Sequence, residues 1–343
     1  MTPLIVETEA GLYCPAGDFH IDPQRGVPRA VITHAHTDHA RRGSQQYLTS
    51  DAGLHVLRQR LGRGVSIRTL PYGERLAIGE VQVSLHPAGH VLGSAQVRVE
   101  HRGRVAVVSG DYKTHADPTC APLEVVRCHE FFSEATFGQP VYRWPPAEAV
   151  LAEINAWWRE NQAAGRTSVI FAYALGKAQR LIASVDASIG PIAVHAKIAD
   201  LLPAYAASGV QLPAAQRLEA AFIRACRGRA LVLAPPSARG ARWLPKFGEY
   251  ATASASGWAL TRGTWGRPAG DRGFVLSDHA DWDGLLATIR ATGAERVGLM
   301  HGQAPSLIRL LRREGVDAYT VGDGSARRDV APLLFDPLTG EAR

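Results

Sequence analysis

The chain has 343 residues, of which 46% are hydrophobic and 20% are charged, and its formal net charge is +6. A chain of this length is too long to fold around one ordinary hydrophobic core. The length therefore predicts two domains, or one domain with a large insertion. The composition is typical of a soluble globular protein, and the positive charge favours an acidic partner such as nucleic acid. No window approaches a membrane span and no signal peptide is recognised, so a membrane partner is excluded and a cytoplasmic location is expected.

The four cysteines are scattered along the chain without Cys-X-X-Cys spacing. We expect reduced thiols, which argues against a disulfide framework and against a thiolate zinc site.

The N-terminal residues 4–8 and 11–23 predict two short strands separated by a turn. Asp22 precedes Pro23 at the end of a strand, twelve residues before the first histidine of the next motif. Such an acid can orient a metal ligand by a hydrogen bond, although an ordinary Asp-Pro turn explains it equally well. Asp18 is the rival candidate for this role.

The most informative stretch follows the apolar run 30–32 and places four residues of metal-ligand type within six positions: His34, His36, Asp38 and His39. An apolar run that stops in a polar cluster predicts a buried strand that delivers a loop to a functional site. The two residues His34 and His36 can bind one metal ion, and the pair Asp38 and His39 can serve a second. Imidazole and carboxylate ligands suit zinc, with manganese or iron as alternatives.

After this loop, Ser50 or Asp51 can cap a helix that carries leucines at helical spacing. Gly and Pro turn signals then separate a run of short strands, expected at 65–70, 76–79, 81–85, 95–100 and 105–109.

Two of these strands lead to further residues of metal-ligand type. His90 lies in a loop with Gly89 and Gly93, where missing side chains allow close backbone approach. Asp111 follows the apolar strand that ends at Ser109, and its carboxylate can bridge two metal ions. Farther along, two more predicted strands lead to His279 and His301.

A strand at 130–133, a helix at 148–165 and a buried strand at 167–173 precede the sequence Gly-Lys-Ala-Gln-Arg, which includes Lys177 and Arg180. A Gly-Lys at a strand-to-helix turn is a candidate phosphate contact, although it lacks the full Walker pattern. Ser237, at a later strand-to-loop junction, is a third candidate for substrate binding. The chain is expected to finish with a helix at 304–315 and a strand at 316–321.

Residues 166–270 contain thirteen Lys and Arg against four Asp and Glu, so this segment carries most of the positive charge. A basic segment on a slightly acidic remainder is the pattern expected of a clamp for phosphate backbones, although basic surfaces also serve solubility. Its tryptophans Trp243, Trp258 and Trp265 could stack on bases or fill a core.

The ligand-type residues resemble the pattern of the metallo-β-lactamase superfamily, His-X-His-X-Asp-His followed by His, Asp and His, matched at His34, His36, Asp38, His39, His90, Asp111 and His301. By this resemblance the first two histidines and His90 hold one zinc ion, Asp38, His39 and His301 hold the other, and Asp111 lies between them. The implied fold is an αββα sandwich with the site at one edge.

The motifs that border the basic segment, Glu-Ala-Thr, Gly-Lys-Ala-Gln, Ser-Asp-His and Met-His-Gly, resemble the β-CASP nucleases, most of all the bacterial ligase-associated DNA exonucleases. The implied organisation is a metallo-β-lactamase domain at 1–165 and 271–343 that is interrupted by a basic β-CASP cap at 166–270. A DNA ligase and a repair helicase are the implied partners.

Two positions depart from this pattern. Arg180 replaces an acid of the related enzymes and is expected to alter the partner of His279. The final ligand His301 is associated by the resemblance more with RNA-acting members, whereas several DNA-acting relatives carry valine there.

The resulting hypothesis is hydrolysis of DNA with two Zn²⁺ ions, or Mn²⁺, by an exonuclease that prefers single strands and acts in repair. The residues expected to take part in catalysis are Asp22, Asp38, Asp111 and His279. The alternatives are an RNA-processing ribonuclease, a small-molecule thioester or lactone hydrolase, and a catalytically silent nucleic-acid-binding subunit.

Overall fold

The computed structural model describes residues 3–261, 271–302 and 304–322, and the chain divides into two compact units. The described residues of unit 1 fall within Met1–Arg143 and His279–Val330, and those of unit 2 fall within Trp144–Asp278. These limits differ from the expected boundaries at 166 and 270. The reason is that helix α2 (Ala147–Ala163) packs on the sheet of unit 2 and strand β17 (Arg272–Phe274) forms its edge.

The first sheet of unit 1 has the strand order β1-β2-β3-β4-β5-β6. Its strands are β1 (Val6–Thr8), β2 (Gly11–Cys14), β3 (Phe19–Ile21), β4 (Arg29–Val31), β5 (Gln46–Ser50) and β6 (Ile67–Leu70). The pairs from β3 to β6 are parallel, whereas β1, β2 and β3 are antiparallel neighbours. The N-terminal stretch thus forms three strands where two were expected.

The second sheet of unit 1 has the order β19-β18-β11-β10-β9-β8-β7. Its strands are β7 (Arg75–Ile78), β8 (Val81–Pro87), β9 (Ala95–His101), β10 (Arg104–Val108), β11 (Glu130–Glu134), β18 (Arg296–Met300) and β19 (Asp317–Thr320). The pairs from β10 to β19 are parallel, so their carboxyl ends meet at one edge of the sheet.

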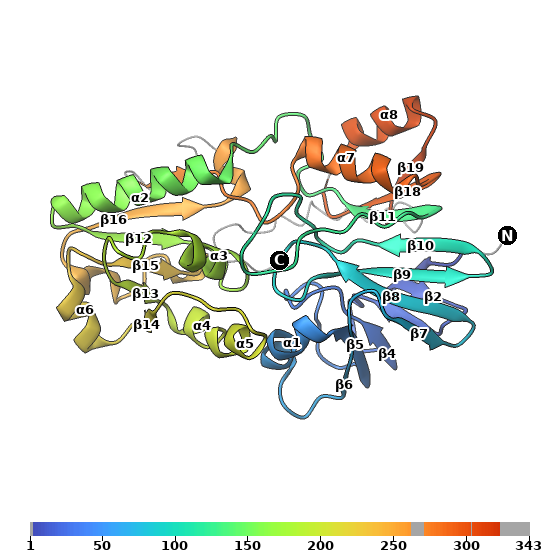
Figure 1. Ribbon diagram of the computed structural model, residues 1–343, viewed down its shortest axis with the longest axis horizontal. Helices are drawn as coiled ribbons and strands as arrows, with labels where there is room; N and C mark the ends of the chain where they lie inside the picture. Colours follow the sequence, from blue (N-terminus) through green and yellow to red (C-terminus); the bar gives the residue numbers. More distant parts are fainter. Residues whose placement is uncertain (1–2, 262–270, 303, 323–343) are drawn as a thin grey trace. The chain divides into compact units, whose positions relative to one another are not determined.

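The core of unit 1 has two layers because strand side chains alternate between faces. On β10, Ala106 and Val108 face the first sheet, and Val105 and Val107 face the helices. Those helices are α7 (Trp282–Thr292) and α8 (Pro305–Arg313), which cover the second sheet in Figure 1. On the other side, helix η1 (Asp51–Gly53), capped by the Ser50 hydroxyl, leads into α1 (Leu54–Leu61), which packs on β6. The arrangement is the expected αββα sandwich.

Unit 2 is built on one parallel sheet with the order β14-β13-β15-β12-β16-β17. The strands besides β17 are β12 (Thr167–Phe171), β13 (Ile192–Val194), β14 (Ala215–Arg217), β15 (Leu231–Ala234) and β16 (Tyr250–Ala255). The helices besides α2 are α3 (Lys177–Ser184), α4 (Ala196–Ala199), α5 (Leu202–Ala207), α6 (Ala220–Cys226), η2 (Pro236–Ala238), η3 (Leu244–Phe247) and η4 (Gly257–Leu260).

Helices cover both faces of this parallel sheet, as its apolar strands require. One core joins β12, β13 and β15 to α2, α3 and α4, and the other joins their opposite faces to α6 and η3. Within the described residues, no helix combines the length and apolar character needed to cross a membrane.

Candidate metal centre

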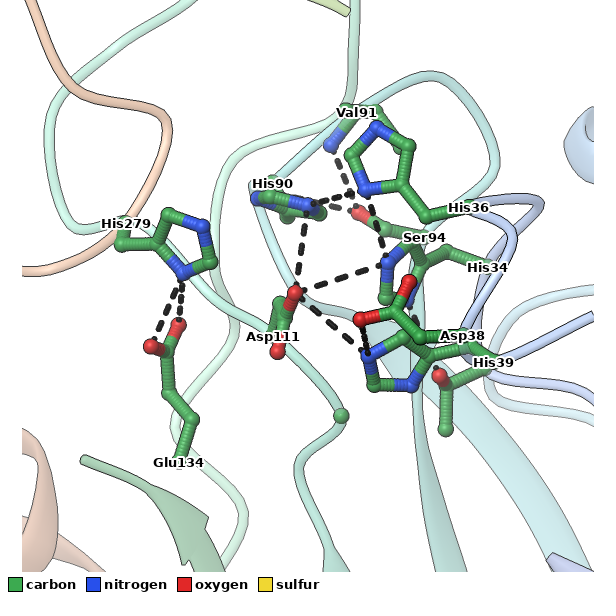
Figure 2. Close-up of polar contacts among 12 residues, drawn as sticks. His34, His36, Asp38, His39, His90, Val91, Ser94, Asp111, Glu134 and His279 are labelled. Atoms are coloured by element: carbon green, nitrogen blue, oxygen red, sulfur yellow. Dashed lines mark hydrogen bonds and ion pairs between the residues drawn. The ribbon is translucent and has the colours of Figure 1, made fainter. Parts of the chain in front are cut away.

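The loop after β4 carries the first ligand-type residues. Ala30, Val31 and Ile32 are buried, and Ala95 donates a backbone hydrogen bond to the Thr33 carbonyl at 2.8 Å, which ties the loop to β9. The amides of His39 and Ala40 both donate to the His36 carbonyl, so the chain turns tightly here. This turn brings side chains that are close in sequence onto one centre, as Figure 2 shows.

Three histidines and one aspartate form the first group, in which one ligand atom from each lies within 4.8 Å of the others: His34, His36, His90 and Asp111. The Nδ1 atom of His36 is 3.0 Å from His34 Nε2 and 3.1 Å from His90 Nε2. Asp111 Oδ2 is 3.6 Å from the same two Nε2 atoms. Such convergence of imidazole nitrogens is the geometry of a metal site.

His39, Asp111 and His301 form the second group, which shares its carboxylate with the first. His39 Nε2 lies 3.5 Å from Asp111 Oδ2, and the rings of His39 and His301 are 5.0 Å apart. Asp38 is next to this group, with its Oδ2 3.7 Å from His39 Nε2, but it does not complete the set of converging atoms. A pocket lined in part by Asp22, His39 and His301 gives access to this side of the centre.

Asp22 lies against the ligand loop, whereas its rival Asp18 does not. The Asp22 carboxylate accepts hydrogen bonds from the backbone amide of Thr33 at 2.8 Å and from His39 Nδ1 at 2.7 Å. Asp18 instead pairs with Arg29 at 2.9 Å on the surface. Both acids have a left-handed backbone, but only Asp22 can fix the tautomer and direction of a ligand-type histidine.

A third group, Asp111, Glu134 and His279, contains a pairing that sequence reasoning missed. His279 Nδ1 lies 2.9 Å from both oxygens of Glu134, and the Tyr112 amide donates to the same carboxylate at 2.7 Å. Glu134 is fully buried at the carboxyl end of β11. The signals in the sequence were an acid that ends an apolar strand and the Glu-Ala-Thr motif that begins at Glu134, and neither indicates that its partner is His279.

Lys177 and Arg180, expected to contact phosphate, are both buried in unit 2. Lys177 Nζ lies 2.9 Å from Asp278 Oδ2, and Arg180 donates to the Ser277 carbonyl at 2.7 Å and lies 3.5 Å from Asp278. Both positive charges are therefore paired inside unit 2, whereas the sequence favoured contact with phosphate. Within unit 1 a partner of His279 is Glu134, and the expected effect of Arg180 on the partner of His279 stays a prediction. Ser237 is exposed on η2.

Two of the three tryptophans for which base stacking or core filling was left open lie within the described residues, and both are partly buried. Trp243 packs against the core that includes Phe247, and its indole nitrogen is buried. Trp258 is half-buried on η4, and Trp265 lies outside the described residues.

The glycines beside His90 allow close packing of backbone on backbone rather than approach to the ligands. Gly89 and Gly93 have φ of +74° and +75°. A Cβ on Gly93 would lie 2.1 Å from the Gly53 Cα, and one on Gly89 would lie 2.5 Å from the Lys113 carbonyl oxygen. No larger residue fits at either position without moving the loop.

The charges of the centre depend on burial and on the neighbours of each group. Burial, then the nearby His39 and His90, lowers the pKa of His34 well below its usual range, so this imidazole is neutral. Burial opposes the charge of His39 too, but the carboxylates of Asp111, Asp38 and Asp22 raise its pKa well above the usual range. Burial likewise opposes ionisation of Asp111, yet His39 and His279 hold the pKa of this carboxyl well below its usual range.

These residues fit a divalent metal centre. His39 Nε2 is buried and has no hydrogen-bond partner. A buried nitrogen without a partner costs free energy unless a bound group, such as a metal ion, interacts with it. The imidazole of His34 is neutral, and its Nε2 lies close to His36 Nδ1, as does His90 Nε2. The lone pairs of these nitrogens can therefore point toward one metal ion. The donor set of imidazoles and a carboxylate matches zinc or manganese and lacks the thiolates of structural zinc sites.

Comparison with known proteins places these features in a family. No protein-family model matches the chain. A probable DNA ligase from Opitutus terrae is 31% identical over 323 residues, which are 94% of this chain and 31% of that protein. Ribonuclease TTHA0252 from Thermus thermophilus is 26% identical over 208 residues, which are 51% of this chain and 45% of that protein. The chain thus spans less than half the length of either relative.

Among solved structures, a protein of unknown function from Enterococcus faecalis superposes with a TM-score of 0.56 at 12% identity, over 81% of this chain and 76% of that one. This likeness concerns the fold alone. The sequence relatives, the αββα sandwich and the interrupting α/β unit agree, and the chain belongs to the β-CASP group of the metallo-β-lactamase superfamily.

Proposed function

We propose that the chain is a metal-dependent nuclease that hydrolyses phosphodiester bonds with two divalent cations. The observation that carries the proposal is the sharing of Asp111 between two groups of ligand-type side chains. Cations bound there would supply the positive charge that polarises a phosphodiester and makes a water molecule more acidic. Family membership supports the same conclusion.

Different side chains of unit 1 would bind the two ions. His34, His36 and His90 would hold one, and His39 and His301 the other with Asp38, while the Asp111 carboxylate serves both. Asp22 keeps Nε2 of His39 directed inward because it accepts the Nδ1 proton at 2.7 Å. Asp22 therefore acts through His39 and does not need to touch substrate.

His279 is proposed to donate a proton to the leaving oxygen or to contact a phosphate oxygen. Its Nδ1 is engaged by Glu134, so the step is proposed for the other ring nitrogen, Nε2. The His279 ring lies 4.8 Å from the His90 ring, beside the ligand groups. Imidazole titrates in the range that such proton transfer requires, and the buried Glu134 carboxylate stabilises the protonated form.

Nucleic acid binding is proposed for exposed cations on α6, η3 and the segments between them, which we call the basic surface: Arg224, Arg227, Arg229, Arg242 and Lys246. The Arg227 guanidinium donates to the Lys246 carbonyl at 2.8 Å, which places α6 beside η3. Two other arginines of unit 2 form ion pairs, Arg217 with Asp200 and Arg239 with Asp271. Among the described residues no acid forms an ion pair with the cations of the basic surface, and exposed cations of this kind suit the phosphate backbone.

The proposed substrate is DNA, degraded as single strands by an exonuclease in repair. An alignment that covers 94% of this chain with part of a probable DNA ligase supports this substrate and cooperation with a ligase. Cooperation with a repair helicase is proposed from the family resemblance alone. A specific observation favours RNA instead: the other relative is named a ribonuclease, and the last ligand is histidine.

The test is incubation of purified protein with end-labelled single- and double-stranded DNA and RNA in Zn²⁺ or Mn²⁺, with the Asp111→Ala variant as control. We expect a ladder of products from single-stranded DNA and none from the variant. Faster cleavage of matched RNA would assign the substrate to RNA, because the 2′-hydroxyl distinguishes the two at one site. Turnover of thioesters or lactones with no salt-dependent nucleic-acid binding would overturn the nuclease proposal.

A further inference from the structure

A buried ion pair lies behind the loop that carries His90. Lys113 is 1% exposed, and its Nζ is 2.6 Å from Asp117 Oδ2. The second oxygen of Asp117 accepts hydrogen bonds from the Thr119 amide at 2.9 Å and from its hydroxyl at 2.7 Å. The carboxylate is thus fixed on both sides, and it fixes the ammonium in turn.

The Lys113 ammonium reaches the main chain of a ligand-type residue. Its Nζ donates to the His90 carbonyl at 3.3 Å. The backbone of the same lysine binds the loop a second time, because its amide donates to the Ala88 carbonyl at 3.1 Å. A third contact is steric, since the Gly89 Cα lies so close to the Lys113 carbonyl that no Cβ fits between them.

The segment that begins at Asp111 therefore supplies one side chain to the centre and then clamps the loop that supplies another. Lys113 is two residues beyond Asp111 and belongs to the same turn after β10. Its contacts fix where the His90 backbone lies, and so where His90 Nε2 lies relative to His36 Nδ1 and Asp111 Oδ2. An apolar side chain would fill the same space but would have no N–H for the His90 carbonyl.

We propose that Lys113, locked by Asp117, is a positioning residue that sets the His90 loop and thereby the metal affinity of the centre. The proposal rests on the proposed function, because it requires that His34, His36 and His90 bind a cation. A merely structural role makes a different prediction. Removing one partner of a buried ion pair destabilises the fold because the other charge is left buried and unpaired. If the pair has only this structural role, replacing both partners restores stability.

The experiment compares Lys113→Met, Asp117→Asn and the double variant with the wild type. Co²⁺ is titrated into metal-free protein and followed by its visible absorption, and thermal unfolding is recorded on the same samples. We expect both single variants to unfold at lower temperature and to bind Co²⁺ about 10- to 100-fold more weakly, the range seen when a group behind a ligand is lost. The double variant should regain thermal stability but not Co²⁺ affinity.

Arg290→Met is the matched control, because it removes an ion pair of unit 1, with Glu314, that touches no ligand-type residue. It should leave the Co²⁺ affinity and spectrum unchanged. Recovery of Co²⁺ affinity in the double variant together with its stability would overturn the positioning role. Absence of Co²⁺ binding by the wild type would overturn the proposed function and this inference with it.

Discussion

The two units use their charged residues in opposite ways. In unit 1 several histidines and acids of the centre, among them His34, His39, His90 and Asp111, are buried and converge, and His39 Nε2 has no hydrogen-bond partner. In unit 2 buried charges form ion pairs, as Lys177 and Arg180 do with Asp278, although Asp271 Oδ1 lacks a hydrogen bond, and cations such as Arg224 and Lys246 lie on the surface. Buried groups that lack partners are costly unless they bind something, whereas exposed cations attract polyanions at little cost. The proposed function accordingly assigns the chemistry to unit 1 and nucleic-acid binding to unit 2.

The largest effect should come from Asp111→Ala, which removes the carboxylate shared by the groups of unit 1. We expect loss of bound metal and a fall in nuclease rate of at least about a thousandfold, since several kcal/mol of charge stabilisation depend on the metal centre. Nucleic-acid affinity, which the proposed function assigns to unit 2, should change little. Metal analysis, cleavage rates and binding isotherms test this prediction. Full activity with full metal content would contradict the proposed role of the unit 1 centre in catalysis.

Glu134→Gln should lower kcat by about a hundredfold while metal content is retained, because an amide cannot stabilise a protonated His279 as a carboxylate does. The matched control is Glu130→Gln on the same strand, whose carboxylate accepts from the Tyr319 hydroxyl at 3.1 Å instead. Steady-state kinetics and metal analysis measure the effect. An unchanged kcat would remove His279 and Glu134 from the mechanism.

Asp22→Asn should weaken metal binding by about 10- to 100-fold, because it loosens the hydrogen bond that orients His39. Asp18→Asn provides a close control, since Asp18 has the same left-handed backbone and lies on the surface away from the centre. Titration of metal-free protein with Zn²⁺ against a competing chelator gives both affinities. Equal affinities for the two variants would show that Asp22 is only a turn residue.

Metal affinity should fall as the pH is lowered. In metal-free protein, neighbouring carboxylates hold the pKa of His39 well above its usual range, so this imidazole keeps its proton near neutral pH. Metal binding must displace that proton, and each proton released changes the affinity about tenfold per pH unit while the group is protonated. Calorimetry in buffers of different ionisation enthalpy counts the protons. A heat that does not depend on the buffer would contradict this reading of His39.

The smallest effect should come from the basic surface. Changing Arg224 and Arg227 together to alanine should raise KM several-fold, leave kcat unchanged at saturating substrate, and reduce the salt slope of binding by about two. Arg159→Ala is a suitable control, because this exposed arginine of unit 2 already pairs with Asp186 at 2.6 Å. A slope identical to that of the wild type would place the nucleic acid elsewhere.

Much of the fold and of the centre could be predicted because the relevant signals are local. An apolar run that stops at a histidine or an aspartate is legible in the sequence, and His34, His90 and Asp111 all occupy such positions. The spacing within residues 34–39 also limits how far apart these side chains can lie. From β6 to β10 the strand boundaries agree with expectation to within a few residues, because alternating apolar residues define them, whereas β5 was not expected.

What the tertiary structure decided is the partner of each ionisable group. Glu134 and His279 are 145 positions apart in sequence, and nothing local in either segment indicates that they meet. Lys177 and Arg180 were candidates for phosphate contact because a Gly-Lys lies at a strand-to-helix turn, yet packing brought Asp278 to them. Sequence specifies which residue types are present and how strands begin and end. Only packing fixes which charge is buried beside which, because burial and pairing depend on segments that the chain brings together from far apart.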